Sequence, residues 1–377
     1  MTENKRAIQF HDVLLTMLLP GLAHIHHGML AKAMLFIGCL AVQGATIGLA
    51  VSKHRFAWLA GPSKYWLSTT LMFVVLAIIW VWAILDLVRS LRKQAEGSTV
   101  VTYWQMASRR FSRDLKGIVG LLIILFVLHI ALFAPFFVSQ DPIKMDLANF
   151  LAQPSAEHPL GQDNYGRDVL DRLIYGARVA LGIGAVATIL NMLFGGVLGL
   201  LGGYFRGITD ATIMRLLEVI NAVPFLVLAL LIISLWGSSV LSLMLVLGIF
   251  GLGPARIIRS EVLSVREEGY VLSAKAIGAP TGRIIMRYVL PNAIASLLVV
   301  TTMSIGVNII VVAGLSFLGF GVRPPIPSWG AMLQQAQEFM RTAWWMAVYP
   351  GLCIIITVFG FNILGDSLRD VLDPRLK

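Results

Sequence analysis

The residues of this 377-residue chain match none of the common catalytic patterns. No Gly-Lys dipeptide occurs, so the chain has no P-loop with which it could bind ATP. The metalloprotease signature His-Glu-x-x-His and the hydrolase signature Gly-x-Ser-x-Gly are also absent. A membrane enzyme would need ionisable side chains clustered around one cavity, and the sequence gives no sign of such a cluster. We therefore predict that the chain is not an enzyme and holds no cofactor of its own.

Four histidines near the N-terminus could bind a metal ion in principle, because imidazole is a common zinc ligand. They are His11, His24, His26 and His27. No carboxylate or cysteine completes the ligand set, and adjacent histidines beside a membrane edge are more often interfacial residues. We therefore expect no metal site.

Asn191 and Asn308 are the polar residues that lie deepest in long apolar stretches. We expect them to form hydrogen bonds between helices, in preference to contacting a substrate. Carboxylates and histidines at mid-membrane usually carry the coupling ion of a gradient-driven transporter. The apolar stretches contain almost none, so the energy for any uphill transport would have to come from another subunit.

The elements that must position these residues are membrane helices. Hydrophobic residues make up 57% of the chain and charged residues 13%, whereas an ordinary globular domain has about 25% charged residues. The apolar residues form blocks of about 20, the length of a helix that crosses a bilayer. We predict an all-α membrane protein with spans at 31–52, 68–89, 117–138, 179–201, 218–236, 239–257, 293–316 and 344–365. A shorter apolar stretch at 13–23 is expected to be interfacial or re-entrant.

The distribution of basic residues predicts the orientation of these spans. Most of the 30 Lys and Arg residues fall in the segments that would share one side with the N-terminus. Positive segments remain in the cytoplasm, so both termini are expected there. The same bias accounts for the net charge of +10 without a nucleic-acid partner.

Composition also suggests how the chain is organised. We interpret residues 1–89 as an N-terminal membrane extension and residues 90–116 as an amphipathic linker. In the linker, Arg109 and Arg110 are interspersed with aromatic residues, as in helices that lie on an anionic membrane leaflet. Residues 117–377 would form the main membrane domain. It contains a polar external segment at 138–178, expected to fold as a cap, and a charged cytoplasmic loop at 256–287.

The loop at 256–287 is predicted to read as helix, break, helix. Ser264 and Glu267 have the spacing of a capping box at the start of a helix. Gly278 suits the C-terminal cap of that helix, and Leu290-Pro291 would mark the start of the next membrane helix.

A stripe of apolar residues is expected on this short helix. Val271, Ala274 and Ile277 recur at three-residue spacing and would share one face. A short surface helix that presents an apolar face on the cytoplasmic side is typical of a docking element for a partner protein.

The loop resembles a known family at this point. The pattern Leu272-Ser273-Ala274, three residues, Gly278, nine residues, Tyr288, one residue, Leu290-Pro291 is similar to the "EAA" loop of ABC-importer permeases. The segments 158–178, 315–332 and 362–375 resemble, in order, further parts of the C-type permease of dipeptide, oligopeptide and nickel importers. The resemblance covers about residues 112–377. Leu272 departs from the pattern, because the family usually has Glu there.

The resemblance implies a fold, partners and a site. The fold would be the type I ABC-importer permease core of six transmembrane helices, here with about two extra N-terminal helices, in a bacterial or archaeal cytoplasmic membrane. The partners would be a second homologous permease, two ABC ATPase subunits that hold ATP and Mg, a substrate-binding protein, membrane lipid and a peptide substrate. The site implied is the ATPase-coupling loop, with Glu267, Glu268, Val271, Leu272, Ser273, Ala274, Ile277, Gly278, Leu290 and Pro291.

Alternatives remain open from the sequence. A nickel or metal-chelate importer would have His or Met facing the pathway, but the many Met residues are more simply packing or lipid-facing residues. The alternative from a different functional class is a membrane scaffold that transports nothing. We expect peptides as the cargo, by association with the family.

Overall fold

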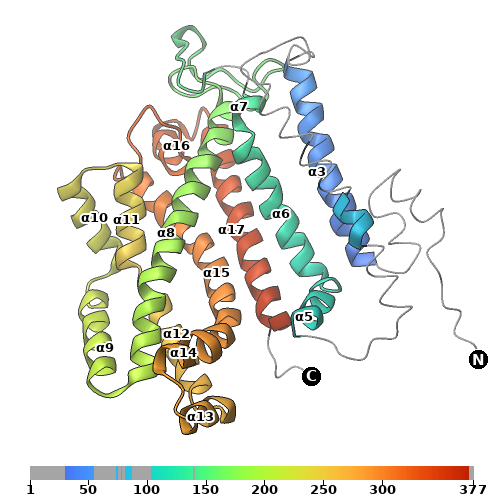
Figure 1. Ribbon diagram of the computed structural model, residues 1–377. Coiled ribbons are helices and arrows are strands. Elements are labelled where there is room, and N and C mark those ends of the chain that lie inside the picture. The colour runs from blue at the N-terminus through green and yellow to red at the C-terminus, as the bar shows by residue number, and fades with distance from the viewer. Residues whose placement is uncertain are drawn as a thin grey trace, which may run out of the picture. The chain divides into compact units, whose positions relative to one another are not determined.

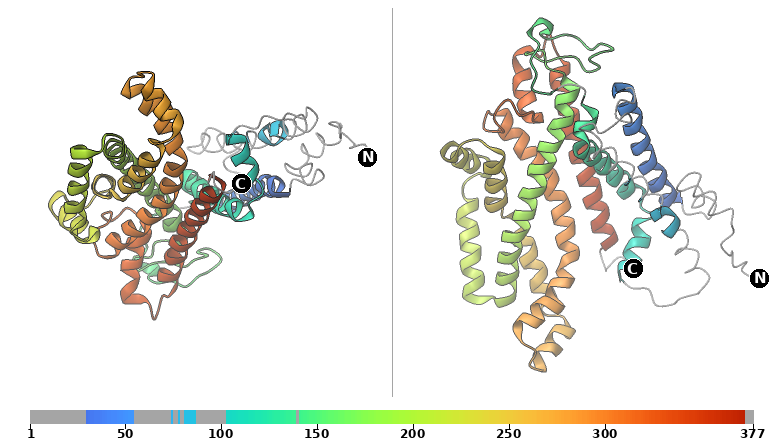
Figure 2. Two further views of the ribbon diagram at one scale, coloured as in Figure 1. Left: turned by 90° about the horizontal axis from the view of Figure 1, so that it is seen from below. Right: turned by 45° about the horizontal axis from the view of Figure 1, so that its top comes forward.

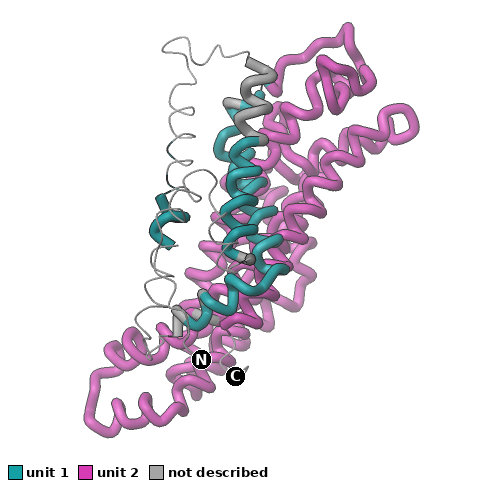
Figure 3. The backbone as a smooth tube through the Cα atoms, turned by 90° about the vertical axis from the view of Figure 1, so that its right-hand side faces the viewer, with its two compact units in different colours: residues 1–141 teal, residues 142–377 magenta. Residues whose placement is uncertain are grey.

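A computed structural model of the chain describes residues 30–54, 74, 78, 81–86, 103–138 and 141–372. They belong to two compact units, residues 1–141 and 142–377, which are coloured separately in Figure 3. The described residues form helices and contain no β-strand beyond one isolated bridge between Gln162 and Asp168. The all-α prediction is therefore confirmed. The predicted stretch at 13–23 and the four N-terminal histidines lie outside the described residues.

Unit 1 contains a helix that matches the first predicted span. Helix α3 (Leu30–His54) covers the predicted 31–52. Residues 81–86, from the second predicted span, are helical, and the rest of 68–89 is described only at positions 74 and 78. The two segments are joined by an ion pair from Lys32 Nζ to Asp86 Oδ2 at 2.7 Å and by an edge-to-face contact between Phe36 and Trp82.

The predicted linker contains a short helix directly before the next span. Helix α5 (Tyr103–Phe111) carries Arg109 and Arg110 in its last turn, and residues 90–102 lie outside the described part of the chain. Asp114 then caps a new helix by accepting a hydrogen bond from the amide of Lys116 at 3.0 Å. That helix, α6 (Leu115–Leu132), is apolar apart from Lys116 and His129 and is followed by the short α7 (Ala134–Phe137).

Unit 2 is built around the long helix α8 (Val169–Phe205), shown in green in Figure 1. Its 37 residues extend about 55 Å at 1.5 Å per residue, well beyond the ~30 Å hydrocarbon core of a bilayer. Helices α11, α12 and α15 pack along it, and α17 packs against α15. The bounds of the other helices are α9 (Gly207–Asn221), α10 (Phe225–Trp236), α11 (Val240–Phe250), α12 (Gly253–Val265), α15 (Leu290–Phe317), α16 (Trp329–Ala336) and α17 (Trp345–Leu372).

The membrane assignment agrees with the helix lengths. Among the described residues, five helical segments are long and apolar enough to cross a membrane, or six if α9 and α10 count as one broken span. Large apolar side chains of α8 also face outward, among them Ile189 (62% exposed) and Leu193 (57%). Such a surface is stable in lipid and would be costly in water.

Gly195, Gly199 and Gly203 recur at four-residue spacing in α8 and allow close contact with α12. A Cβ at Gly199 would lie 2.4 Å from the carbonyl oxygen of Ala255, and one at Gly203 would lie 2.8 Å from that of Arg259. Only glycine lets the backbones of α8 and α12 approach this closely.

The two buried asparagines join helices, as expected. The Asn191 side chain donates a hydrogen bond to the carbonyl oxygen of Leu247 in α11 at 2.9 Å. The Asn308 side chain in α15 donates to the hydroxyl of Thr188 in α8, also at 2.9 Å.

The predicted span at 218–236 is not one continuous helix. Helices α9 and α10 are separated by a short break and bent by 78° relative to each other. Pro224 causes the break: it precedes α10 with extended backbone angles (φ −52°, ψ 125°), and the residue before a proline is disfavoured in a helix. Alone, the 12 residues of α10 extend only about 18 Å, too short to cross a bilayer.

The polar segment before α8 forms a folded cap, as predicted. Buried Asp163 accepts hydrogen bonds from the Nε of Arg167 (2.7 Å) and from two backbone amides. It also forms an ion pair with buried Arg172 at 3.3 Å. Trp345 of α17 donates to the carbonyl oxygen of Gln162 at 3.1 Å, which fastens the cap to the helices. Figures 1 and 2 show the cap at one end of α8 and helix α13 (Gly269–Ala276) at the other.

Candidate functional site

The predicted coupling loop lies between α12 and α15 and contains three short helical segments. They are α13 (Gly269–Ala276), α14 (Thr281–Ile284) and the π-helical turn η3 (Ile285–Val289). The predicted capping box is wrong, because Ser264 still belongs to α12. Helix α13 begins later, after Glu268, whose side chain makes no capping hydrogen bond.

The C-terminal cap at Gly278 is confirmed. Gly278 has φ +76°, a left-handed conformation that glycine adopts without a steric penalty. Its amide bonds to the carbonyl oxygen of Lys275 at 3.0 Å, and the amide of Ala279 bonds to that of Ala274 at 3.1 Å. This pair of hydrogen bonds is a Schellman motif, which ends α13 sharply.

Pro291 explains the π-helical turn that precedes α15. Proline has no amide hydrogen, and its ring would clash with the carbonyl group four residues earlier, that of Arg287. Widening the helix at residues 285–289 relieves this clash, and the amide of Leu290 bonds to the carbonyl oxygen of Ile285, five residues earlier. Helix α15 then begins at Leu290-Pro291, as predicted.

The expected outward apolar stripe on α13 is wrong for two of its three residues. Val271 is fully buried and Ala274 is 4% exposed. Both pack in a cluster, here called the seat, that gathers residues from the ends of α8, α12 and α15. The seat comprises Tyr204, Ile258, Val262, Val265, Val271, Ala274, Ile284, Val289 and Ala293. These residues therefore hold α13 in place and cannot contact a partner.

The surface that α13 does present, here called the outer face, consists of Tyr270, Leu272, Ser273 and Ile277. Ile277 is 83% exposed, Leu272 46% and Tyr270 43%. The backbone carbonyl of Glu268 accepts hydrogen bonds from the amides of Val271 and Leu272. Its side chain, two residues before Tyr270, forms no hydrogen bond or ion pair within the described part of the chain. Burial, and secondarily the negative charge of Glu268, raises the pKa of the Tyr270 hydroxyl. The outer face is thus apolar with a single acid at its edge.

Positive charges gather around Tyr204 at the end of α8 and fix the loop to it. The Arg266 side chain donates a hydrogen bond to the carbonyl oxygen of Tyr204. The ammonium group of Lys275 lies 5.5 Å from the centre of the Tyr204 ring, within the range of a cation–π contact. Partial burial, followed by repulsion from Arg266, lowers the pKa of Lys275.

Arg206 adds a link from the corner between α8 and α9 that the sequence did not suggest. Its Nη2 atom lies 2.8 Å from Oε1 of Glu267, with the two side chains 45% and 52% exposed. The backbone of Arg206 has φ 57° and ψ −162°, at the edge of a region that only glycine occupies readily. Such strain costs about 1–3 kcal/mol, whereas an exposed ion pair contributes only about 0–1 kcal/mol.

A second ion pair fastens α9 near the same corner. The guanidinium group of Arg259 in α12 donates two hydrogen bonds, at 2.5 Å each, to the two carboxylate oxygens of Asp210 in the first turn of α9. Two-point contacts of this kind fix orientation as well as distance. This pair could not be predicted from the sequence, since the partners are 49 residues apart.

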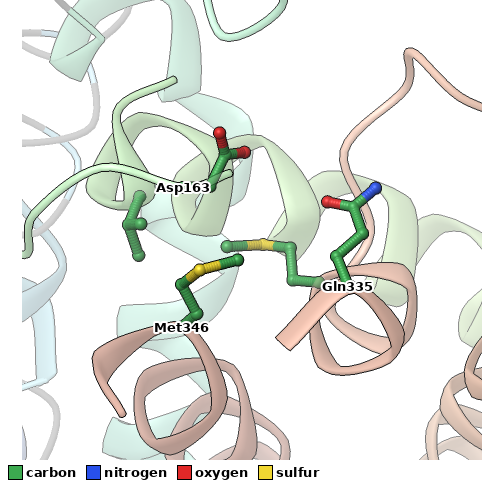
Figure 4. Close-up of a pocket in the computed structure, with 5 residues that line it drawn as sticks. Asp163, Gln335 and Met346 are labelled. Atoms are coloured by element: carbon green, nitrogen blue, oxygen red, sulfur yellow. The ribbon is translucent and has the colours of Figure 1, made fainter. Parts of the chain in front are cut away.

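Two cavities within the described part of unit 2 are small. One of about 10 Å³ lies between the cap and α16–α17, where Asp163, Gln335 and Met346 surround it (Figure 4). Another, also of about 10 Å³, is lined by residues of α8, α15 and α16, including Trp329. Both are far smaller than the ~300–1,000 Å³ of typical ligand pockets. Neither has the size of a site that could enclose a peptide.

Comparison with known proteins assigns the chain to a family. Residues 195–377 match the model of the binding-protein-dependent transport system inner membrane component. Residues 102–154 match the N-terminal TM domain of oligopeptide transport permease C, a match that begins within the segment interpreted as a linker.

Curated relatives cover most of the chain. The dipeptide transport system permease protein DppC of Alkalihalophilus pseudofirmus is 39% identical over 74% of this chain and 92% of its own length. The glutathione transport system permease protein GsiD of Pectobacterium atrosepticum is 38% identical, over 74% and 93%. The oligopeptide transport system permease protein OppC of Bacillus subtilis is 36% identical, over 74% and 91%.

Among solved structures, one of the MetNI methionine ABC transporter in inward-facing conformations matches 53% of this chain and 96% of that chain, with 18% identity and a TM-score of 0.44. The extent and identity of the curated relatives decide the family. The chain belongs to the binding-protein-dependent transport system inner membrane components, as a permease subunit of the dipeptide, oligopeptide and glutathione ABC-transporter group.

Proposed function

We propose that the chain moves di- or oligopeptides across the cytoplasmic membrane as one of two homologous permease subunits driven by two ABC ATPase subunits. The observation that carries this proposal is the construction of α13. Buried Val271 and Ala274 hold the helix firmly on the ends of three long helices. The opposite side exposes apolar residues that have no partner within the described chain, as expected of a docking element.

The path of the peptide would lie between this chain and a second permease. The cavities described in unit 2 are too small to enclose a peptide. The side-chain nitrogens of Asn191 and Asn308 are used in hydrogen bonds between helices. A surface shared with a second subunit would therefore supply the pathway, which opens alternately to the two sides of the membrane as the ATPases close and separate.

Peptides are favoured as the cargo by the relatives. Their names specify dipeptides, oligopeptides and glutathione, which is itself a small peptide. In the proposed orientation both termini and α13 face the cytoplasm, following the distribution of basic residues. The cap at the other end of α8 would then receive a substrate-binding protein outside.

The decisive experiment replaces Ile277 with Asp. A carboxylate on the most exposed apolar residue of the outer face should prevent an apolar partner surface from closing over it, without changing the buried seat. We expect the ATPase subunits to be lost when the tagged chain is purified from membranes, together with the uptake of labelled trialanine by cells. The amount of inserted chain should not change.

Leu147→Asp serves as the matched control, because Leu147 is 70% exposed but lies in the cap. This variant should retain the ATPase subunits. Normal ATPase recovery and uptake with Ile277→Asp would contradict the docking role of α13.

A further inference from the structure

The corner between α8 and α9 contains an arginine where glycine would be less strained. Arg206 ends α8 through a hydrogen bond from its amide to the carbonyl oxygen of Gly202 at 3.1 Å, and it directly precedes α9. Backbone strain of this kind, about 1–3 kcal/mol, is at least as large as the ~0–1 kcal/mol that an exposed ion pair contributes. Stability therefore does not account for an arginine side chain at this position.

The side chain of Arg206 adds a link between this corner and the coupling loop, beside the contacts of Arg266 and Lys275 with Tyr204. Its partner Glu267 lies in the turn between α12 and α13 and also approaches Arg266, at 3.8 Å. On the other side of the corner, Arg259 holds Asp210 in the first turn of α9. The corner is thus tied to the coupling loop at Glu267 and to α12 at Arg259.

We propose that Arg206 is a positioning residue that couples the movement of α13 to α9 through its ion pair with Glu267. This inference rests on the proposed docking role of α13. A displacement of the loop is passed to the corner by the ion pair, and the Asp210–Arg259 contact keeps the first turn of α9 aligned with α12.

A movement of the corner would be transmitted along α9 to its far end. The helix stops at Asn221, and after the break at Pro224 the chain continues in α10 at an angle of 78°. A broken helix can change its bend with few lost hydrogen bonds, because the backbone groups at the break are already outside the helical ladder. Movement of α9 can therefore alter the angle to α10 while α8 stays straight.

The first test measures the link itself, whatever is transported. The full chain, purified with its copurifying subunits in nanodiscs, is compared with Arg206→Gly and Glu267→Gln by hydrogen exchange of the amides in residues 268–279. Both variants should exchange about fivefold faster there, the factor that corresponds to losing a contact of modest strength. Arg206→Gly should nevertheless unfold at the same temperature or higher, because it relieves the backbone strain.

Two controls separate the ion pair from general effects of charge. Arg206→Lys keeps the positive charge and should restore most of the protection. Arg215→Gln removes an arginine whose ion pair to Glu218 at 2.9 Å lies wholly within α9. It should leave exchange of the loop unchanged. Unchanged exchange in both Arg206→Gly and Glu267→Gln would overturn the link.

The second test measures transmission in the same preparations, as trialanine uptake per ATP hydrolysed. Arg206→Gly and Glu267→Gln should each lower this ratio severalfold, and the double variant should be no worse than either single one, because both remove the same contact. A looser loop with an unchanged ratio would overturn the coupling role. If the wild-type complex takes up no peptide, the proposed function fails, while the exchange measurement still decides whether the link exists.

Discussion

Gly199→Ala is expected to destabilise the chain, because α8 and α12 are in contact at this residue without room for a methyl group. A Cβ at Gly199 would lie 2.4 Å from the carbonyl oxygen of Ala255 and 3.1 Å from the amide nitrogen of Arg259. Both are backbone atoms, so no side chain can rotate away and the two helices must separate. Overpacking of this kind costs about 1–3 kcal/mol.

Gly182→Ala, in the same helix, is the matched control. Nothing lies within 4 Å of a Cβ at Gly182. Removing a glycine from the interior of a helix then stabilises it by about 0.5–1 kcal/mol, since alanine loses less backbone entropy on folding.

The measurement is the thermal unfolding midpoint of the full chain in detergent, followed by tryptophan fluorescence. Each 1 kcal/mol shifts the Tm of a 150–250-residue unit by about 2–4 °C. We expect a decrease of about 2–12 °C for Gly199→Ala and an increase of about 1–4 °C for Gly182→Ala, from these free energies. Shifts of the same sign for the two variants would refute the close contact between α8 and α12.

Two further predictions concern the loop and unit 1. Gly278→Ala meets no steric obstacle but must keep φ +76°. It should therefore cost about 1 kcal/mol and speed amide exchange at residues 274–279 about fivefold. Gly269→Ala, also unobstructed but without a positive φ, should leave this exchange unchanged, and equal exchange rates in the two variants would exclude backbone strain at Gly278. Lys32→Met should lower the Tm more than the double variant Lys32→Met/Asp86→Leu. The single change leaves the Asp86 carboxylate, which is only 28% exposed, beside an apolar residue. Additive decreases in Tm from the two single changes would show that the ion pair is unimportant.

Much of the fold was predictable because membrane helices can be recognised from their apolar composition alone. Blocks of about 20 apolar residues identify membrane helices whatever their neighbours are, and the glycine repeat at Gly195, Gly199 and Gly203 identifies a face where backbones meet. The complete break between α9 and α10 could not be derived from hydropathy, which does not register backbone direction. Pro224 was visible, but a proline near the start of a span is compatible with either a kink or a complete break.

The loop shows a different limit of periodicity. Three-residue spacing correctly placed Val271 and Ala274 on one side of α13, but spacing cannot tell whether that side meets the chain itself or a partner. The answer depends on Tyr204 and Val262, which come from other helices and are brought close only in the folded chain. In a helix as short as α13, burying two residues is enough to reverse the assignment of the faces.

The charges of the loop show how a departure from the family pattern can be accommodated. Leu272 stands where the resemblance leads one to expect an acid, so Glu267 and Glu268 were the remaining candidates to meet a partner. Glu267 is held by Arg206 within the chain, and Glu268 stands at the edge of the outer face with no partner among the described residues. If an acid of this loop contacts an ATPase, it is therefore Glu268.

Glu268→Gln should weaken recovery of the ATPase subunits without loosening the loop, whereas Glu267→Gln should loosen the loop first. The reverse order of effects would show that the ion pair to Arg206 opens when the partner binds.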